Sequence, residues 1–336
     1  MKRLPAIAVI VGGLIAAGGT GGPARASAVS TGFSFAVIGD IPYGTAQIAA
    51  FPKRIAQINA DVDVRMVMHV GDIKNGSSLC SDAYYSMIRS NFDKFVDPLV
   101  YTPGDNEWTD CHTPLNGRFD PLKRLATVRT RFFPRPGFTL GQHPMTLRTQ
   151  ANLGLPENVR FDRVGVPFAA LHVVGSNNGL ANRTGRTAPT VGQAAEVQSR
   201  TAADIRLIKE TFAHAIASQS PAVVLVMQAD MFSPSVSSPR FADYSAFKTI
   251  VQTIALRAAA FGKPVVLFNG DSHVFRQDHP LAAKSSWLSF YGVTTSAPNL
   301  TRVTVDGSTA VSRWLKVTIN VNTPNVASWV RVPFVA

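Results

Sequence analysis

The sequence predicts an α/β fold in which packed, mostly parallel β-sheets are covered by helices. Two observations support this prediction. Apolar, strand-like runs alternate along the chain with segments of helical periodicity. In addition, four of the apolar runs end in the dipeptide Gly-Asp, at Asp40, Asp72, Asp105 and Asp271. Ligands of open α/β sheets lie beyond the carboxyl ends of the strands, so these four carboxylates mark a candidate site.

The first half of the chain reads as strand and helix in alternation. The run FSFAVIGD is the first strand, and residues 45–60 follow as a helix with one discordant residue, Pro52. The run RMVMHVGD at 65–72 has the bulky residues of a strand that is covered on both faces. Residues 81–96 place aromatic and aliphatic side chains at helical intervals after Ser81, a candidate helix cap. The run PLVYTPGD is the third strand.

The second half is expected to contain an insertion, a hairpin, a long helix and a β-rich tail. Residues 113–157 are rich in Pro, Gly and Arg and predict an irregular insertion with one short helix at 121–131. A hairpin that bends at 164–166 precedes the longest helix, at about 190–218. Three strand-like runs after residue 299 end the chain. Between the long helix and this tail, strand, helix and strand are expected at 222–227, 243–261 and 265–270.

Composition and the first residues indicate a folded, exported protein. The chain has 336 residues, of which 46% are hydrophobic and 16% charged, so it can bury a sizeable core. Lys2 and Arg3 precede an apolar stretch and then a small-residue segment. We therefore expect residues 1–28 to be a secretory signal peptide, with an uncleaved anchor as the alternative. Residues 29–336 would form a single domain, secreted or periplasmic, with no stable membrane span after cleavage.

The protein is basic. Its net charge is +12, and it falls to +9 without residues 1–28, because that segment holds three basic residues and no acid. A basic surface attracts phosphorylated small molecules and anionic envelope components. The densest basic segment, residues 123–135, carries no known nucleic-acid motif and reads as a helix with a solvated basic face. We expect a phosphorylated small-molecule or envelope substrate and no specific nucleic-acid partner.

The chain has two cysteines, Cys80 and Cys111. Each follows an acidic strand end, at Asp72 and Asp105, so the two thiols would meet if those strands are neighbours. Export permits a disulfide. We predict that the cysteines pair, with two free buried thiols as the alternative. Closing a loop of about 30 residues stabilises the fold by roughly 3 to 4 kcal/mol in the chain-entropy account.

The strand ends predict a metal site with oxygen-rich ligands. A single Gly-Asp after a strand is ordinarily a turn or a helix cap, but four of them at strand ends are hard to attribute to chance. Carboxylates that converge on one sheet edge repel one another unless cations or protons neutralise them. Further polar residues follow the same strands or the strand at 222–227, namely Asn106, Glu107, Gln228 and His273.

In order and spacing these residues resemble the motifs of the calcineurin-like metallophosphoesterases, which include the purple acid phosphatases. The family's motifs are D-x-H, G-D, G-N-H-E/D, a lone His and G-H-x-H, and the resemblance runs from Phe33 to the β-rich tail. It implies a four-layer sandwich of two packed, mixed β-sheets flanked by helices. It also implies a metal-dependent enzyme that hydrolyses phosphate esters through a metal-activated water.

The resemblance is imperfect at four histidine positions of the family, where this chain has Pro42, Asn106, Gln228 and Asp271. It implies that Asp72 bridges two metal ions. Oxygen ligands with a single imidazole favour one or two ions of Mg²⁺, Mn²⁺ or Ca²⁺ over Zn²⁺, with iron as an alternative. Read position by position, the resemblance implies metal ligands at Asp40, Asp72, Asp105, Gln228, Asp271 and His273.

The resemblance also implies roles in catalysis and substrate binding. Asn106 stands where the family has the histidine that protonates the leaving group, and Glu107 is retained beside it. An amide can hydrogen-bond a phosphoryl oxygen but cannot give up a proton as histidine does. Lys74 and Asn75 are candidates for substrate binding. Lys74 would otherwise occupy the space of a missing cation, and a merely solvated loop lysine is an equal alternative.

Two other functions stay open at this point. The lost histidines suit a catalytically weak or inactive member of the family that keeps the fold as a binding protein. The segment LFNGDSHVF resembles the G-D-S turn of the SGNH esterases, with Ser272 as nucleophile. That turn normally opens the chain, whereas here it falls near the end and no D-x-x-H follows.

Overall fold

The structure is a computed structural model, which describes Met1 and residues 32–233 and 237–335. The expected signal peptide at 1–28 therefore lies, apart from Met1, outside the described residues. By its internal contacts the chain divides into two units, Met1–Ser30 and Thr31–Ala336. The second unit contains the secondary structure and the candidate site.

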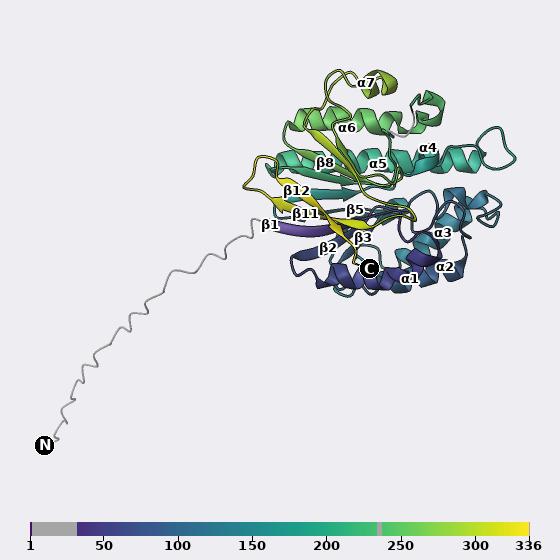
Figure 1. Ribbon diagram of the computed structural model, residues 1–336. Helices are drawn as coiled ribbons and strands as arrows, with labels where there is room; N and C mark the ends of the chain where they lie inside the picture. Colours follow the sequence, from purple (N-terminus) through teal and green to yellow (C-terminus); the bar gives the residue numbers. More distant parts are fainter. Residues whose placement is uncertain (2–31, 234–236, 336) are drawn as a thin grey trace. The chain divides into compact units, whose positions relative to one another are not determined.

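The described residues form two mixed sheets (Figure 1). One sheet has five strands in the order β12-β11-β1-β2-β3. The strands β1, β2 and β3 run parallel, and β11 and β12 are antiparallel to their neighbours. The strand bounds are β1 Gly32–Ile38, β2 Val64–His69, β3 Leu99–Tyr101, β11 Arg313–Asn320 and β12 Ala327–Pro333.

The other sheet has seven strands in the order β4-β5-β6-β7-β8-β10-β9. Its four central strands, β6, β7, β8 and β10, run parallel, while β4, β5 and β9 pair antiparallel at the two sides. The bounds are β4 Arg148–Gln150, β5 Leu155–Arg163, β6 Val166–Ala170, β7 Val223–Val226, β8 Val265–Asn269, β9 Arg276–Asp278 and β10 Leu300–Thr304.

Helices cover the outer face of each sheet (Figure 1). The five-stranded sheet is covered by α1 Gly44–Ala60, α2 Asp82–Phe92 and α3 Pro121–Phe132. The seven-stranded sheet is covered by α5 Val191–Ala217, α6 Lys248–Phe261 and α7 Ser286–Tyr291. The remaining short elements are α4 Gly175–Asn178 and single turns at Thr109–His112, Ala151–Leu153, Phe241–Asp243 and Ser245–Phe247.

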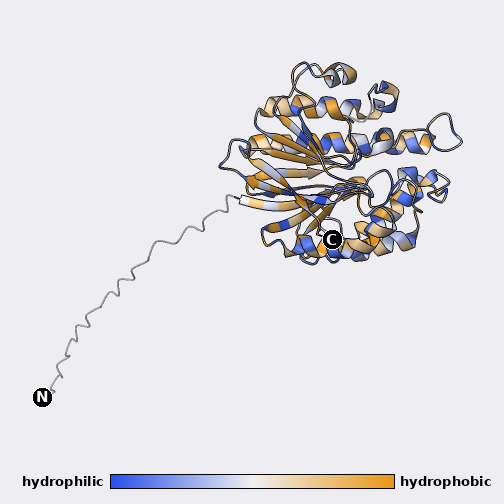
Figure 2. Cartoon of the chain, in the orientation of Figure 1, coloured by the Kyte–Doolittle hydropathy of each residue, from blue (hydrophilic) through white to orange (hydrophobic). Residues whose placement is uncertain are grey.

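Three hydrophobic layers hold these elements together. Successive strand residues point to opposite faces, so Val223 of β7 packs under the helices while Val224 packs between the sheets. In β1, Phe35 likewise belongs to the layer between the sheets, whereas Ala36 packs toward α1 and α2. Figure 2 shows the strands as predominantly hydrophobic, with hydrophilic residues on the helices and loops. The predicted four-layer sandwich of two mixed sheets between helices is confirmed.

The elements differ from those expected in a few places. Within residues 113–157, the structure has α3, the short strand β4 and the start of β5. The β-rich tail divides between the two sheets, because β10 pairs with β8 while β11 pairs with β1. The short elements β9 and α7 carry too few residues to show a periodicity, and the sequence did not indicate them.

Candidate functional site

The candidate site lies beyond the carboxyl ends of parallel strands from both sheets. Asp40 follows β1, Asp72 follows β2, Asp105 follows β3 and Asp271 follows β8. The first three are buried and Asp271 is partly exposed. The backbone N–H of Asp271 donates to the Asp40 carboxylate at 3.1 Å, so a residue after β8 touches one after β1. The structure thus brings together strand ends that are up to 231 residues apart.

The backbone of this site is unusual. Asp40, Asp72 and Asp271 have φ angles of 52°, 57° and 73°, in the left-handed region that residues other than glycine seldom adopt. Such conformations persist where the surrounding structure imposes them, and they cluster at functional sites. The neighbouring glycines allow a close approach, because a Cβ on Gly104 would collide with Asp72, and one on Gly270 with Asp40.

Three side chains of this cluster lie close enough together to hold a metal ion. Asp40, Asp72 and His273 each offer one ligand atom, and these atoms lie within 4.8 Å of one another. The Nε2 atom of His273 lies 3.3 Å from Oδ1 of Asp40, and this hydrogen bond raises the pKa of His273. The Tyr43 hydroxyl donates to Asp72 Oδ2 at 2.9 Å and lies 3.4 Å from Asp40 Oδ1. Burial raises the pKa of this phenol well above its usual value, so Tyr43 acts as a donor here.

Asn106 contacts Asp72 directly. Its Nδ2 donates to Asp72 Oδ2 at 2.6 Å and to the Tyr43 hydroxyl at 3.1 Å. Its backbone N–H donates to Asp72 Oδ1 at 3.2 Å. Asn106, which occupies the position of the proton-donating histidine in the resemblance, therefore lies at the cluster and donates hydrogen bonds there.

Glu107 lies beside the cluster and is fully buried. Its Oε1 accepts from the backbone N–H groups of Asp72 at 3.1 Å and Gly104 at 2.6 Å, and from the Tyr101 hydroxyl at 2.7 Å. Its Oε2 is buried without a partner among the described residues. These bonds join the chain after β2 to the chain after β3, so Glu107 positions both strand ends.

Asp105 is held by neutral donors on both oxygens. Gln228, just after β7, donates from Nε2 to Asp105 Oδ1 at 3.1 Å, and Ser176 donates to Oδ2 at 2.9 Å. The side-chain oxygen Oε1 of Gln228 accepts from the Gly175 N–H at 2.6 Å. The predicted ligand atom of Gln228 is thus already engaged by the backbone, and metal binding by Gln228 stays a prediction.

Asp230 and Arg302 form a second buried group behind Asp271. The N–H of Asp230 donates to Asp271 Oδ2 at 2.9 Å, and Arg302 pairs with both Asp230 and Asp278. The Ser272 hydroxyl donates to Asp230 Oδ2 at 2.6 Å. In residues 32–233 and 237–335, no hydrogen bond joins Ser272 to a histidine, so the serine-esterase alternative gains no support from the geometry.

The electrostatics of the cluster favour a cation. Burial raises the pKa of Asp72 well above its usual value, and the charges of Asp105 and Glu107 raise it further. Burial also raises the pKa values of Asp105 and Glu107. Negative charge is therefore costly here unless protons or a cation balance it. The donor set and the crowding of the carboxylates fit a divalent metal ion.

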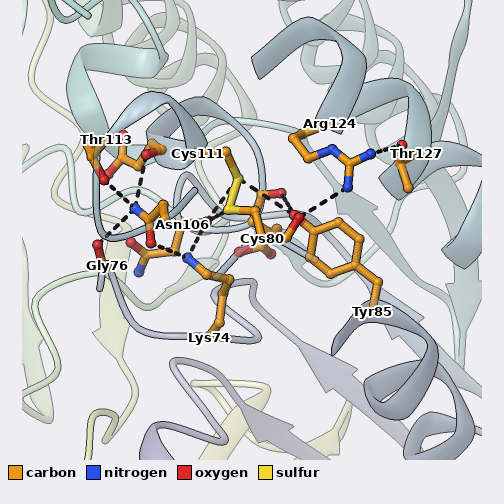
Figure 3. Close-up of a disulfide and its surroundings, with 12 residues drawn as sticks. Lys74, Gly76, Cys80, Tyr85, Asn106, Cys111, Thr113, Arg124 and Thr127 are labelled. Carbon is orange, nitrogen blue, oxygen red and sulfur yellow. Dashed lines mark hydrogen bonds between the residues drawn. A yellow bond between two sulfur atoms is a disulfide. The ribbon is translucent and has the colours of Figure 1, made fainter. Parts of the chain in front are cut away.

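Lys74 is the buried basic residue beside these acids. Its ammonium donates to the Asn106 carbonyl at 2.8 Å and to Asn116 Oδ1 at 3.1 Å (Figure 3). Burial lowers the pKa of Lys74, and the nearby charges of Glu107 and Asp72 oppose that effect. The side chain of Asn75 accepts from the Ser77 N–H at 3.0 Å within its own turn. Substrate binding by Lys74 and Asn75 stays a prediction, since their side-chain bonds are made within the protein.

The predicted disulfide is confirmed. Cys80 and Cys111 are bonded, with Cα atoms 5.8 Å apart and a sequence separation of 31. The bridge joins the loops after β2 and β3, and Figure 3 shows it beside Asn106 and Tyr85. The Tyr85 hydroxyl donates to the Glu107 carbonyl at 2.5 Å. The disulfide therefore braces the segment that carries Asp105, Asn106 and Glu107.

Removing the disulfide is expected to destabilise the protein. We expect the double variant Cys80→Ala, Cys111→Ala to lose about 2 to 4 kcal/mol of unfolding free energy, because its unfolded chain is less constrained. Urea denaturation with and without dithiothreitol measures this. The reduced wild type should approach the variant, and the variant should not respond to the reductant. Equal stability of the oxidised wild type and the variant would contradict the prediction.

The sequence was compared with known protein families and structures. Residues 33–158 match the calcineurin-like phosphoesterase family. The predicted resemblance is thereby confirmed for this segment, which includes Asp40, Asp72, Asp105, Asn106 and Glu107. No curated protein matches the sequence significantly. One similar solved structure is that of GAP50, the anchor in the inner membrane complex of Plasmodium, with 8% identity, a TM-score of 0.47, and coverage of 91% of this chain and 90% of that one.

The calcineurin-like match ends before Gln228, Asp271 and His273. The structure nevertheless brings these residues to the same site, because β7 and β8 run parallel in the seven-stranded sheet. Tyr43 and Ser176 also contact the cluster, and the sequence did not indicate them. Tyr43 lies three residues after Asp40, so its closeness in sequence was the available signal.

Proposed function

We propose that this protein is a secreted, divalent-metal-dependent phosphoesterase. The observation that carries the proposal is the set of three ligand atoms from Asp40, Asp72 and His273, within 4.8 Å of one another in an acidic cluster. The calcineurin-like match over residues 33–158 supports the same chemistry. Asp105, Gln228 and Asp271 complete the proposed ligand set.

The donor set suits a hard cation. Carboxylate oxygens with one imidazole favour Mg²⁺, Mn²⁺ or Ca²⁺ over Zn²⁺, with iron as an alternative, and the site would hold one or two ions. When bound, such an ion supplies the positive charge that polarises a phosphoryl oxygen and activates water for attack.

Asn106 and Glu107 have separate roles beside the proposed metal ion. Asn106 presents amide N–H groups, which can hydrogen-bond a phosphoryl oxygen but cannot protonate a leaving group. Loss of a general acid typically lowers the rate by about 10² to 10⁴-fold, so we expect good leaving groups to be favoured strongly. Glu107 holds the two strand ends in place through its bonds to the backbone of Asp72 and Gly104.

The disulfide and the first residues support the proposed location. Disulfides form and persist in oxidising compartments, which suits a secreted or periplasmic protein. No helix among the described residues is long and apolar enough to cross a membrane. A phosphorylated small molecule or an envelope component is the proposed substrate.

The test measures metal content and phosphate-ester hydrolysis of the exported protein. Sequencing its amino terminus shows whether it is cleaved after residue 28. Elemental analysis should find bound divalent metal. Hydrolysis of 4-nitrophenyl phosphate or its bis-ester should be stimulated by Mn²⁺ and abolished by a chelator. A folded protein that binds no divalent ion and hydrolyses neither ester would contradict the proposal.

A binding protein with this fold is the second candidate. It is favoured by the neutral donors on both oxygens of Asp105 and by the lost proton donor at Asn106. A protein that binds metal or phosphate but hydrolyses neither activated ester would support this candidate over the enzyme.

A further inference from the structure

A cavity of about 640 Å³ opens beside the acidic cluster. Asp271, Gly175 and Ser176 are among its lining residues, so it adjoins the proposed catalytic centre. Tyr244 and Phe247 also line it. Its size suits an organic group attached to a phosphate ester.

The lining of this cavity is free of basic side chains among the described residues. It includes the carboxylates of Asp230, Asp243 and Asp271, and no Lys, Arg or His. This absence is notable in a protein whose net charge is +12.

Two arginines near the lining are paired with carboxylates. Arg302 is buried and pairs with Asp230 and Asp278. Arg240 pairs with Asp243 at 2.8 Å. The buried pair with Asp230 holds Arg302 away from the role of an anion-binding residue in the cavity.

The rest of the wall is neutral and partly aromatic. The Tyr244 ring packs 6.3 Å from Trp287 and 5.8 Å from Phe290, which back the wall with a cluster of rings. Ala181 and Asn182 also line the cavity, and both are exposed. Aromatic rings with scattered amides and hydroxyls suit a neutral, partly apolar organic group.

Resting on the proposed phosphoesterase function, we propose that this cavity binds the organic group of the ester and selects an uncharged one. The substrate is then an ester with a single phosphate, and compounds that carry a further phosphate are disfavoured. A second phosphate in the cavity would meet no basic side chain among the described lining residues, and Arg302 and Arg240 are already paired with Asp230 and Asp243. In water, a like charge that stays unbalanced 6 Å away weakens binding by a factor of about 3, and a less polar medium increases the effect.

The experiment uses a matched pair of inhibitors that differ by one phosphate. The metal-loaded protein hydrolyses 4-nitrophenyl phosphate in the presence of fructose 6-phosphate or fructose 1,6-bisphosphate. The inhibition constant of each sugar phosphate is measured. We expect the monophosphate to have an inhibition constant at least about threefold lower. A bisphosphate that binds as tightly or more tightly, with hydrolysis intact, would overturn the selectivity while leaving the phosphoesterase proposal standing. No hydrolysis at all would overturn both.

Charge variants test whether the cavity is responsible. Ala181→Lys should shift the ratio of the two inhibition constants toward the bisphosphate by about three- to tenfold, because it adds a cation to the wall. Ala181→Gln controls for side-chain length, and Ala213→Lys places the same charge on the exposed side of α5. Both controls should keep the wild-type ratio. If Ala181→Lys behaves like Ala181→Gln, or if Ala213→Lys matches Ala181→Lys, the cavity does not select the substrate.

Discussion

Asp72→Asn is expected to lower kcat/KM for an activated phosphate ester by about 10³-fold or more and to abolish tight metal binding. Asp72 is one of the three clustered ligands and is the residue expected to contact both ions of a two-ion centre. Charge stabilisation by a catalytic metal is worth several kcal/mol, and about 1.4 kcal/mol corresponds to a tenfold change in rate. Isothermal titration with Mn²⁺ and steady-state kinetics measure the two effects.

The substitution should leave the fold intact. Asn tolerates the left-handed backbone that Asp72 adopts at φ 57°. It removes a buried charge that Asp105 and Glu107 repel, which offsets the acceptor lost to Asn106 or Tyr43, so we expect the metal-free variant to stay folded. Asp162→Asn, at a partly exposed pair with His214, is the matched control and should bind metal normally. Wild-type Mn²⁺ affinity in Asp72→Asn would contradict the assignment.

The sequence predicted the framework of the site because its signal is local. Each Gly-Asp directly follows an apolar run, and the direction of a strand determines where its end lies. The strand-like runs after residue 299 likewise predicted β11. They did not determine which sheet β11 joins, because the partner strand β1 is nearly 300 residues away in the sequence.

The contacts that surround the carboxylates were not predictable in the same way. Ser176 reaches Asp105 because residues 176–178 adopt three consecutive left-handed conformations. Nothing in the segment Gly175–Asn178 requires that turn, and a helix more than 20 residues later supplies the side chain that holds it. Polar contacts of this kind depend on tertiary structure, so a local pattern does not reveal them.

That side chain is Arg200, which is 1% exposed. It donates to the carbonyls of His172 at 2.8 Å and Asn178 at 2.7 Å, and it also bonds the Asn178 side chain. On its other side it pairs with Glu196 at 2.8 Å. Arg200 is therefore a positioning residue that holds the turn from which Ser176 and Gly175 reach Asp105 and Gln228.

Arg200→Met is expected to lower the unfolding free energy by about 3 to 5 kcal/mol, because Glu196 and two buried carbonyls lose their partner. Arg200→Lys keeps the charge but not the forked donor geometry, so it should recover only part of that loss. Urea denaturation measures both. The control is Ile254→Ala, a core truncation in α6 whose expected cost of about 2 to 5 kcal/mol is similar.

If Arg200 only stabilised the fold, the folded variants Arg200→Met and Ile254→Ala would bind Mn²⁺ with the same affinity. We expect instead that Arg200→Met weakens Mn²⁺ binding and Ile254→Ala does not, because only the former releases the turn against Asp105 and Gln228. Titration at a temperature where both variants are folded separates the two roles. Equal affinities would show that the turn stabilises the fold without positioning the metal ligands.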